Sequence, residues 1–347
     1  MKMNIKKIFI GILAILIVFA ICFVAVKGGK GRANNGKIKV VTSNFACYDF
    51  LRAVIGNSDN VELTFLMGPG KDAHSYDPTA QDLIKIQEAD LFVYVGGEME
   101  QWSEKVLNTL ERQNQEIVCI ADFVDTIDEK EVDGSEEHDH EHEHEEDAHK
   151  HGDDDDENEE EHEHHHHEEG AFDEHIWTSP ENAIKMVKAL NEAVKRIDKS
   201  NSEKYDKNAE DYIAKIKDVD LKIQEIVNNK KRDRLIFADK MPMQYFVEYY
   251  NLNVTAAFNG CSTETEPSAK TIAYIENKVK SEKIPVVLYI ELSNGKVAKT
   301  IADEVGNGCR AMQIQTIHNV SLDDFNKGET WVSLMNKNIE VLRAALQ

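Results

Sequence analysis

Several features that mark common protein classes are missing from this sequence of 347 residues. Its five cysteines are widely spaced and form no CxxC pair, which excludes a scaffold built mainly from disulfides. Two alternatives remain for the four cysteines beyond the N-terminus. They form one disulfide bridge between Cys261 and Cys309, or they are buried free thiols. No stripe of basic residues marks a nucleic-acid surface. The chain also lacks a GxxxxGK[ST] phosphate-binding loop and a GxSxG motif, and its HEEDAH stretch has the wrong spacing for a zinc protease helix.

Long apolar runs are also scarce, and the prominent one lies at the N-terminus. Ile8 to Val26 is an uncharged run of 19 residues that follows three lysines and precedes a tether rich in glycine and asparagine. Because this length is just enough to cross a bilayer, the run predicts an uncleaved anchor or an ordinary signal segment. Lipid attachment at Cys22 is an alternative, although Ile21 before it is larger than such sites prefer. In each case we expect an extracytoplasmic protein, tethered to the outer face of the cell membrane or secreted.

Nearly all of the net charge of −24 comes from one segment in the middle of the chain. Residues 128–169 hold 23 acidic residues against Lys130 and Lys150, together with eleven of the fourteen histidines. A segment so poor in apolar residues cannot offset the entropy lost on ordering, so we expect a disordered loop at about 128–170 in the absence of metal. Histidines that alternate with carboxylates predict many weak zinc sites, and a solvated spacer is the alternative. The histidines are His138, His140, His142, His144, His149, His151, His162, His164, His165, His166 and His167.

The rest of the chain alternates between stretches typical of strands and of helices. Strand-like segments lie at 37–43, 61–67, 90–96 and 116–122, and the alternation returns at 234–239, 252–258, 286–292 and 311–317. Strands separated by helices pair in parallel and form doubly wound α/β sheets. Between the two sets, apolar residues at spacings of three and four predict two long helices or one bent helix. We therefore expect two four-stranded α/β lobes joined by a long rigid helix, with a ligand site in the cleft between them.

This pattern divides the chain into four parts. Residues 1–36 form the N-terminal segment and tether, 37–179 the first lobe with the acidic loop, 180–230 the linking helices, and 231–347 the second lobe. Three histidines lie outside the acidic loop, namely His74, His175 and His318, and each follows a strand or lies in a turn. A single histidine of this kind is usually an ordinary turn or core residue. Three of them together predict a metal site, because neutral imidazole suits zinc and other late divalent metals.

Four stretches resemble, in order and spacing, motifs of the zinc and manganese solute-binding proteins of ABC transporters. They are GPGKDAHSYDPTAQDL, ADLFVYVGGEMEQW, FDEHIWTSPENA and TEPSAKTIA. The resemblance runs from about Lys37 to the C-terminus and implies two α/β lobes bridged by a rigid helix, with one metal between them. His74 and His175 match the first two histidine ligands of that family. A histidine-rich insert between these ligands is typical of its zinc-handling members.

The second lobe departs from the family pattern. In IFADKMPMQYF, Lys240 or the neighbouring Asp239 stands where the third ligand is usually a histidine, and Asp239 is the better candidate because a protonated lysine cannot bind a metal. The family's fourth ligand, usually an aspartate, falls near His318. The donor-rich stretch GCSTETEP offers further candidates for the shell, while a solvated turn is the alternative for its glutamates. These candidates are Cys261, Glu264 and Glu266.

The function that the resemblance implies is extracytoplasmic capture of zinc and its delivery to a membrane permease by a monomeric, non-enzymatic protein. A manganese-binding member of the same family is one alternative, with Mn²⁺ in place of Zn²⁺. A zinc-dependent surface enzyme is another, and it would need an open water position and a nearby general base. A third is an adhesin or surface zinc buffer.

Overall fold

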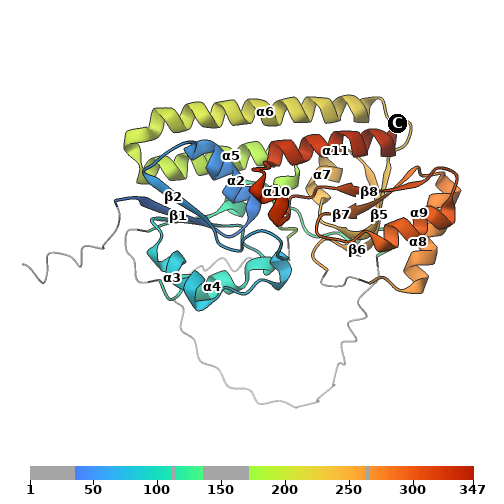
Figure 1. The fold of residues 1–347 in the computed structure, drawn as a ribbon, viewed down its shortest axis with the longest axis horizontal. Coiled ribbons are helices and arrows are strands. Elements are labelled where there is room, and N and C mark those ends of the chain that lie inside the picture. Colours follow the sequence, from blue (N-terminus) through green and yellow to red (C-terminus); the bar gives the residue numbers. More distant parts are fainter. Residues whose placement is uncertain (1–35, 111–114, 136–171, 263–265) are drawn as a thin grey trace, which may run out of the picture. The chain divides into compact units, whose positions relative to one another are not determined.

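The computed structural model describes residues 36–110, 115–135, 172–262 and 266–347. Within them, Ile38–Gln347 form one compact unit, whose elements are labelled in Figure 1. The expected N-terminal anchor or signal and the eleven histidines of the acidic loop lie outside the described residues. Among the helices that are described, none is both long enough and apolar enough to cross a membrane.

The first half of the chain folds around a four-stranded parallel sheet. Its strands lie in the order β2-β1-β3-β4, and three helices connect them. Because the chain leaves β1 to one side for β2 and then crosses to β3 on the other, a crevice forms at the carboxyl ends of these strands. The strands are β1 (Ile38–Thr42), β2 (Val61–Phe65), β3 (Leu91–Tyr94) and β4 (Glu116–Cys119), and the helices are α2 (Phe45–Ile55), α3 (Ala80–Glu88) and α4 (Trp102–Leu107).

The second half repeats this topology. Its strands form a parallel sheet in the order β6-β5-β7-β8. The pairing of β5 with β6 shifts register between Phe237 and Lys240. The two sheets confirm the expected fold of two four-stranded α/β lobes. The elements are β5 (Arg234–Met241), α7 (Gln244–Tyr249), β6 (Asn253–Asn259), α8 (Ala269–Glu282), β7 (Val286–Ile290), α9 (Lys296–Val305), β8 (Arg310–Ile314) and α10 (Leu322–Asn326).

Two helices, rather than one bent helix, join the lobes. α5 (Pro180–Ile197) begins after Ser179, whose hydroxyl accepts from the third residue beyond it, and proline in the first turn favours the same start. After a break at residues 198–201, α6 (Ser202–Asn228) lies against α5 (Figure 1). Asn208 of α6 donates to the Val54 carbonyl in the first lobe at 2.9 Å, and Asp220 accepts from the Tyr250 hydroxyl in the second at 2.8 Å. One helix is therefore fixed to both lobes.

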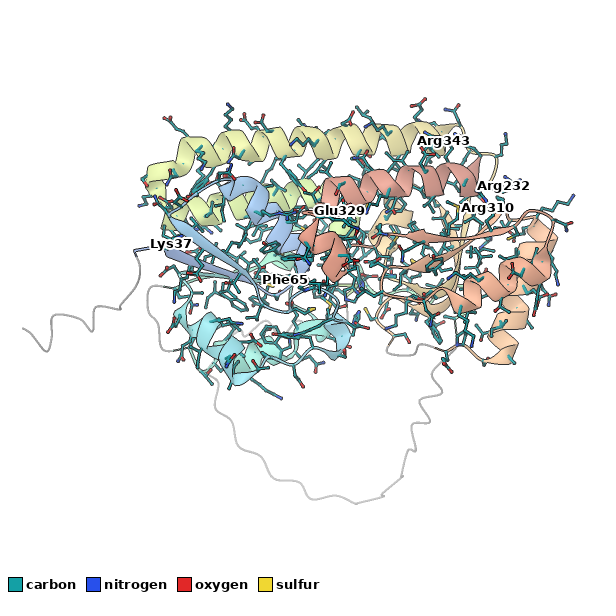
Figure 2. All side chains as sticks on the ribbon, viewed as in Figure 1. Lys37, Phe65, Arg232, Arg310, Glu329 and Arg343 are labelled. Carbon is teal, nitrogen blue, oxygen red and sulfur yellow. The ribbon has the colours of Figure 1, made fainter. Side chains whose placement is uncertain are left out.

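The last helix of the chain returns to the first lobe. α11 (Trp331–Leu346) packs on α6 and α2, and its first residue, Trp331, donates its backbone N–H to the buried Asp49 of α2 at 2.7 Å. Just before this helix, the carbonyl of Glu329 (Figure 2) accepts from the Arg52 guanidinium at 2.6 Å. The Trp331 indole donates to the Trp177 carbonyl at 2.9 Å. The C-terminal helix therefore ties the two halves of the chain together.

The start of the acidic segment differs from the expectation of disorder from about residue 128. Asp128 forms an antiparallel bridge with Phe172, and Asp133 forms a parallel bridge with Thr255 of β6. The Asp133 carboxylate also accepts from the Thr255 hydroxyl at 2.9 Å and pairs with Lys278 at 3.0 Å. The prediction is wrong for residues 128–135, because partners distant in sequence supply the contacts that this polar stretch lacks on its own.

A large apolar core runs through both lobes. One cluster of buried side chains includes Val40 and Phe92 of the first sheet, Leu190 of α5, and Phe237 and Leu288 of the second sheet. A smaller cluster lies within the second lobe, among β5, β7, α8 and α9. The lobes share the larger core, so a wide opening of the cleft would expose apolar surface to water. This exposure would cost about 25 cal/mol of free energy per Å².

Candidate metal centre

His74 lies in a single turn of 3-10 helix, residues Ala73–Ser75, between β2 and α3. The side chain of Asp72 accepts from the His74 backbone N–H at 3.0 Å and starts this turn. The residues that follow carry the capping box of α3, in which Thr79 and Asp82 exchange hydrogen bonds. The motif GPGKDAHSYDPTAQDL therefore forms a rigid turn followed by a helix start, and the turn holds a half-buried imidazole at the edge of the first lobe.

His175 lies fully buried at the start of another 3-10 turn, Ile176–Thr178, which leads directly into α5. Oδ1 of Asp173 lies 2.8 Å from the His175 backbone nitrogen and 2.9 Å from its ring Nδ1. The carbonyl of Asp173 in turn accepts from the Tyr245 hydroxyl of α7 at 2.7 Å. With Nδ1 donating to a carboxylate, the lone pair of Nε2 is the one available to a metal.

His318 follows β8 and comes from the second lobe. The buried carboxylate of Glu291 accepts from the Thr316 N–H at 2.7 Å, the Thr316 hydroxyl at 2.8 Å and the His318 N–H at 2.9 Å. Between these residues, Ile317 has a φ of +62°, a strained value for a β-branched side chain. Glu291 therefore stabilises a tight turn that directs the imidazole into the protein. The buried Nε2 of His318 has no hydrogen-bond partner among the described residues.

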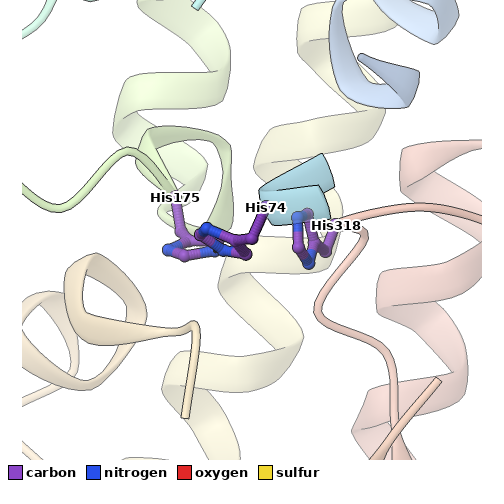
Figure 3. A group of neighbouring side chains, drawn as sticks. All are labelled: His74, His175 and His318. Carbon is purple, nitrogen blue, oxygen red and sulfur yellow. The ribbon is translucent and has the colours of Figure 1, made fainter. Parts of the chain in front are cut away.

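The three imidazoles meet in one place (Figure 3). One nitrogen from each of His74, His175 and His318 lies within 4.8 Å of the other two, and Nε2 of His74 is 3.4 Å from Nε2 of His175. The ring centroids are separated by 4.9 to 5.4 Å. Trp177 borders the group, with its ring near those of His175 and His318. Buried nitrogens that converge with an unpartnered lone pair fit a bound cation better than a packed core.

The electrostatics of the three rings differ. Burial, together with the charge of His175, lowers the pKa of His74 to about 4. Burial also lowers the pKa of His318 well below the usual 6.5. Burial alone would lower the pKa of His175 as well, but the Asp173 carboxylate outweighs it and raises this pKa. Two of the three rings are therefore neutral and ready to bind a metal at neutral pH.

Comparison with known proteins is consistent with this geometry. Residues 40–345 match the family model described as ZnuA, zinc-uptake complex component A, periplasmic. The chain belongs to this family. The ZnuA family consists of non-enzymatic solute-binding proteins, which removes support from the alternative of a zinc-dependent enzyme.

Two curated ZnuA-type relatives show how far the similarity extends. The zinc-binding lipoprotein AdcA of Streptococcus pneumoniae strain R6 is 29% identical over 313 residues, covering 89% of this chain and 56% of AdcA. The chain thus spans about half the length of the AdcA proteins that it matches. The high-affinity zinc uptake system protein ZnuA of Bacillus subtilis is 30% identical over 338 residues, covering 95% of this chain and 97% of that protein.

Solved structures agree with the fold. The crystal structure of the Zn(II)-bound ZnuA-like domain of Streptococcus pneumoniae AdcA has a TM-score of 0.68 at 27% identity and covers 90% of this chain and 99% of that domain. A Mn-bound periplasmic metal-binding protein from Candidatus Liberibacter asiaticus has a TM-score of 0.64 at 20% identity, covering 88% of this chain and all of that protein. The second likeness concerns the fold alone.

Asp239 is not brought into the three-histidine group. Its carboxylate accepts from the backbone N–H of Lys240 at 2.9 Å and lies 3.4 Å from the backbone nitrogen of Ile290. It borders a cavity of about 360 Å³ that also touches Lys240 and His318. The ammonium of Lys240 is buried and lies 3.4 Å from Asp72 of the first lobe. The Asp239 carboxylate is thus engaged by backbone N–H groups, while the neighbouring Lys240 pairs with Asp72.

The remaining candidates from the sequence separate into three groups. Cys261 lies beside His175 and Glu174, with its Sγ 3.0 Å from Oε2 of Glu174. Glu266 is exposed and is not part of the three-histidine group. Glu264 and the histidines of the acidic loop lie outside the described residues. Among the described residues, Cys47, Cys119, Cys261 and Cys309 are all free thiols, and the Cys261–Cys309 bridge is not formed.

Sequence reasoning missed the two carboxylates that orient the histidines. Asp173 stands two residues before His175 in FDEHIW, and this short spacing is a signal that could have indicated it. Glu291 follows β7, and its carboxylate accepts from the backbone N–H of His318, which lies 27 residues later in the sequence. The two residues come together because β7 and β8 are neighbouring strands. Both carboxylates fix the orientation of a ring or turn in the three-histidine group.

Proposed function

We propose that this protein captures zinc outside the cytoplasm and delivers it to the permease of an ABC transporter, with His74, His175 and His318 as the metal ligands. The observation that carries the proposal is the convergence of three buried or half-buried imidazoles from separate segments, one of them with an unpartnered Nε2. The family description as a zinc-uptake component supports a membrane permease as the partner. The zinc-uptake and lipoprotein descriptions of the relatives support an extracytoplasmic location.

The donor set favours zinc over manganese. All three donors are imidazole nitrogens, which suit Zn²⁺, whereas Mn²⁺ prefers carboxylates, carbonyls and water. No carboxylate belongs to the three-histidine group among the described residues. Bound Zn²⁺ would retain one position for water or a further protein donor, as a tetrahedral ion with three protein ligands does.

The acidic loop supports the same function in a different way. We infer that its eleven histidines collect zinc at weak, interchangeable sites, while the cleft holds one ion tightly. The ordered ends of the loop support this division, because Phe172 lies three residues before His175 and residues 128–135 contact the second lobe beside the cleft. A tethered loop raises the local concentration of zinc at the site.

Calorimetry on two variants tests the proposal. Deleting residues 138–167 should abolish several weak zinc equivalents and leave one tight site. His318→Ala should remove the tight site and leave the weak ones. A tight site that survives His318→Ala, or that disappears with the loop, contradicts the assignment. Zinc uptake by cells that carry His318→Ala, compared with wild type, tests the transport role.

A further inference from the structure

A second group of metal-ligating side chains lies against the three-histidine group and shares one residue with it. Ligand atoms of Glu174, His175 and Cys261 all lie within 4.8 Å of one another. The Cys261 Sγ is 3.0 Å from Oε2 of Glu174. Glu174 and His175 are buried, with 1% and 0% of their surface exposed, and Cys261 is half-buried. Three different donor types thus meet at the lobe boundary on residues from both lobes.

Glu174 is held in place by the loop after β3. Its Oε1 accepts from the Met99 backbone N–H at 2.9 Å. Its Cγ lies over Gly97, where an added Cβ would come within 2.4 Å, and Gly97 has a φ of +79°. A side chain at position 97 would therefore both strain the backbone and displace the carboxylate. Oε2 is the oxygen that remains for Cys261 or for a cation.

Cys261 is held from the ordered start of the acidic segment. Its backbone N–H donates to Oε1 of Glu129 at 3.1 Å, so residues 128–135 and the turn after β6 are joined at this point. Burial, reinforced by the negative charge of Glu174, raises the pKa of the thiol. In the metal-free protein the thiol donates its proton to Glu174, and a divalent cation replaces that proton, which passes to solvent.

The shared histidine makes the two groups exclusive. Asp173 holds Nδ1 of His175 at 2.9 Å, which leaves Nε2 as the free lone pair of this ring, and both groups include His175. One lone pair binds one metal at a time. A cation bound with Cys261 and Glu174 therefore takes His175 away from His74 and His318.

We propose that Glu174, His175 and Cys261 form a second metal position, selective for a thiophilic divalent cation, which exchanges with the three-histidine position through His175. Thiolate sulfur selects soft metals, whereas the three-histidine group offers nitrogen alone. Cd²⁺ should occupy the sulfur position in preference, and Zn²⁺ should occupy either. The proposal rests on metal binding at His175 and is independent of the transport step.

The test is a titration of the full-length, reduced protein with Cd²⁺, followed by ultraviolet absorption of the thiolate-to-Cd²⁺ charge transfer. Wild type should develop this band and saturate at one thiolate-bound ion. Cys261→Ser should lose the band and bind Cd²⁺ at least tenfold more weakly. Cys309→Ser is the matched control, because Cys309 is another half-buried thiol, and it should keep the full band. The histidines of the acidic loop contribute nothing to this signal because they contain no sulfur.

Two outcomes overturn the proposal. They are the absence of a band in wild type and a band of full intensity in Cys261→Ser. A second measurement on unmodified protein guards against a folding defect in the variant. Alkylation followed by peptide mass analysis should show that Cd²⁺ slows modification of Cys261 and leaves Cys309 unaffected, and equal rates with and without Cd²⁺ count against the site.

The same variants separate this proposal from the proposed function. His318→Ala should lose tight zinc binding yet keep the Cd²⁺ band, because His318 is not part of the sulfur position. His175→Ala should weaken both. Tight zinc binding that persists in His318→Ala contradicts the three-histidine assignment alone, whereas an unchanged Cd²⁺ spectrum in Cys261→Ser contradicts the sulfur position alone.

Discussion

Oδ1 of Asp173 lies 2.9 Å from Nδ1 of His175 and 2.8 Å from the backbone nitrogen of the same residue. One carboxylate oxygen therefore fixes both the backbone and the ring of a single histidine in the three-histidine group. It selects the tautomer that leaves Nε2 open, and its charge makes the ring a stronger donor.

Asp173→Ala should weaken zinc binding at the tight site by about 10–100-fold, because outer partners of metal-ligating histidines typically contribute that much. Asp173→Asn keeps an acceptor but removes the charge, so its loss should be smaller. Competition with a chelator of known affinity measures both. The control is Asp125→Ala, which removes an exposed carboxylate paired with Lys185. An affinity in Asp173→Ala equal to that of the control would show that His175 does not depend on this contact.

The pH dependence of zinc binding follows from the unequal pKa values of the three rings. With the pKa of His74 lowered to about 4 and that of His318 also lowered, both rings stay neutral as the pH falls through 6.5. The raised pKa of His175 means that this ring is the first to take up a proton. Zinc affinity should therefore fall by about tenfold per pH unit below the pKa of His175, and more steeply below about pH 4.

Calorimetry in buffers of different ionisation enthalpy counts the protons that zinc displaces from these rings. A variant lacking residues 138–167 should be used, so that the loop histidines add no protons of their own. At pH 6 the tight site should release one proton from the three histidines. Release of more than about two protons would show that all of these rings titrate as exposed imidazoles do.

Lys240 should oppose zinc binding. Its buried ammonium adds to the effects that lower the pKa values of His74 and His318, so it disfavours any positive charge placed between them. Lys240→Met should raise zinc affinity roughly tenfold, which is about 1.4 kcal/mol, because it removes a positive charge that acts on both rings. Lys240→Arg keeps the charge and is the control. A fall in affinity with Lys240→Met would indicate that the Lys240–Asp72 ion pair positions the His74 turn.

Asp49 should contribute strongly to stability although it lies outside the metal centre. Its buried carboxylate accepts from Trp331, Tyr212 and Arg52. Asp49→Ala leaves the Trp331 N–H and the Tyr212 hydroxyl without this acceptor, removes the charge that faces Arg52, and should lower the free energy of unfolding by about 3–5 kcal/mol. Urea denaturation of the metal-free protein measures the loss. Removing the exposed ion pair on α6 with Asp218→Ala should cost less than about 1 kcal/mol, and a similar small loss for Asp49→Ala would contradict the prediction.

The sequence predicts the sheets well because their signals are local. The β-branched run KIKVVTS favours a strand through its own composition, and the apolar spacing in 180–229 favours helices in the same local way. His318 could be placed at the site because the carboxyl ends of parallel strands meet at one edge. These inferences need the spacing of apolar residues and the order in which strands and helices follow one another along the chain. Both can be read from short stretches of sequence.

The errors arise where contacts between distant residues decide the outcome. From its sequence neighbours Asp239 is the better candidate for a ligand, but in the fold its carboxylate accepts from the backbone N–H of Lys240 and lies outside the three-histidine group. Residues 128–135 are too polar to fold alone and become ordered through Thr255 and Lys278, which lie more than a hundred positions later. The composition of a segment indicates whether that segment can fold by itself. It does not indicate which residues from distant parts of the chain will contact it.

The return of α11 to the first lobe also determines the order in which the two lobes can complete their folding. The carboxylate of Asp49 lies near the start of the chain, yet one of its buried donors, Trp331, enters only with the last helix. Until that helix has docked, α2 and α6 lack one of the helices that pack against them. The first lobe therefore cannot complete its packing ahead of the second, because α11 follows β8 and must dock before Asp49 has all of its buried donors.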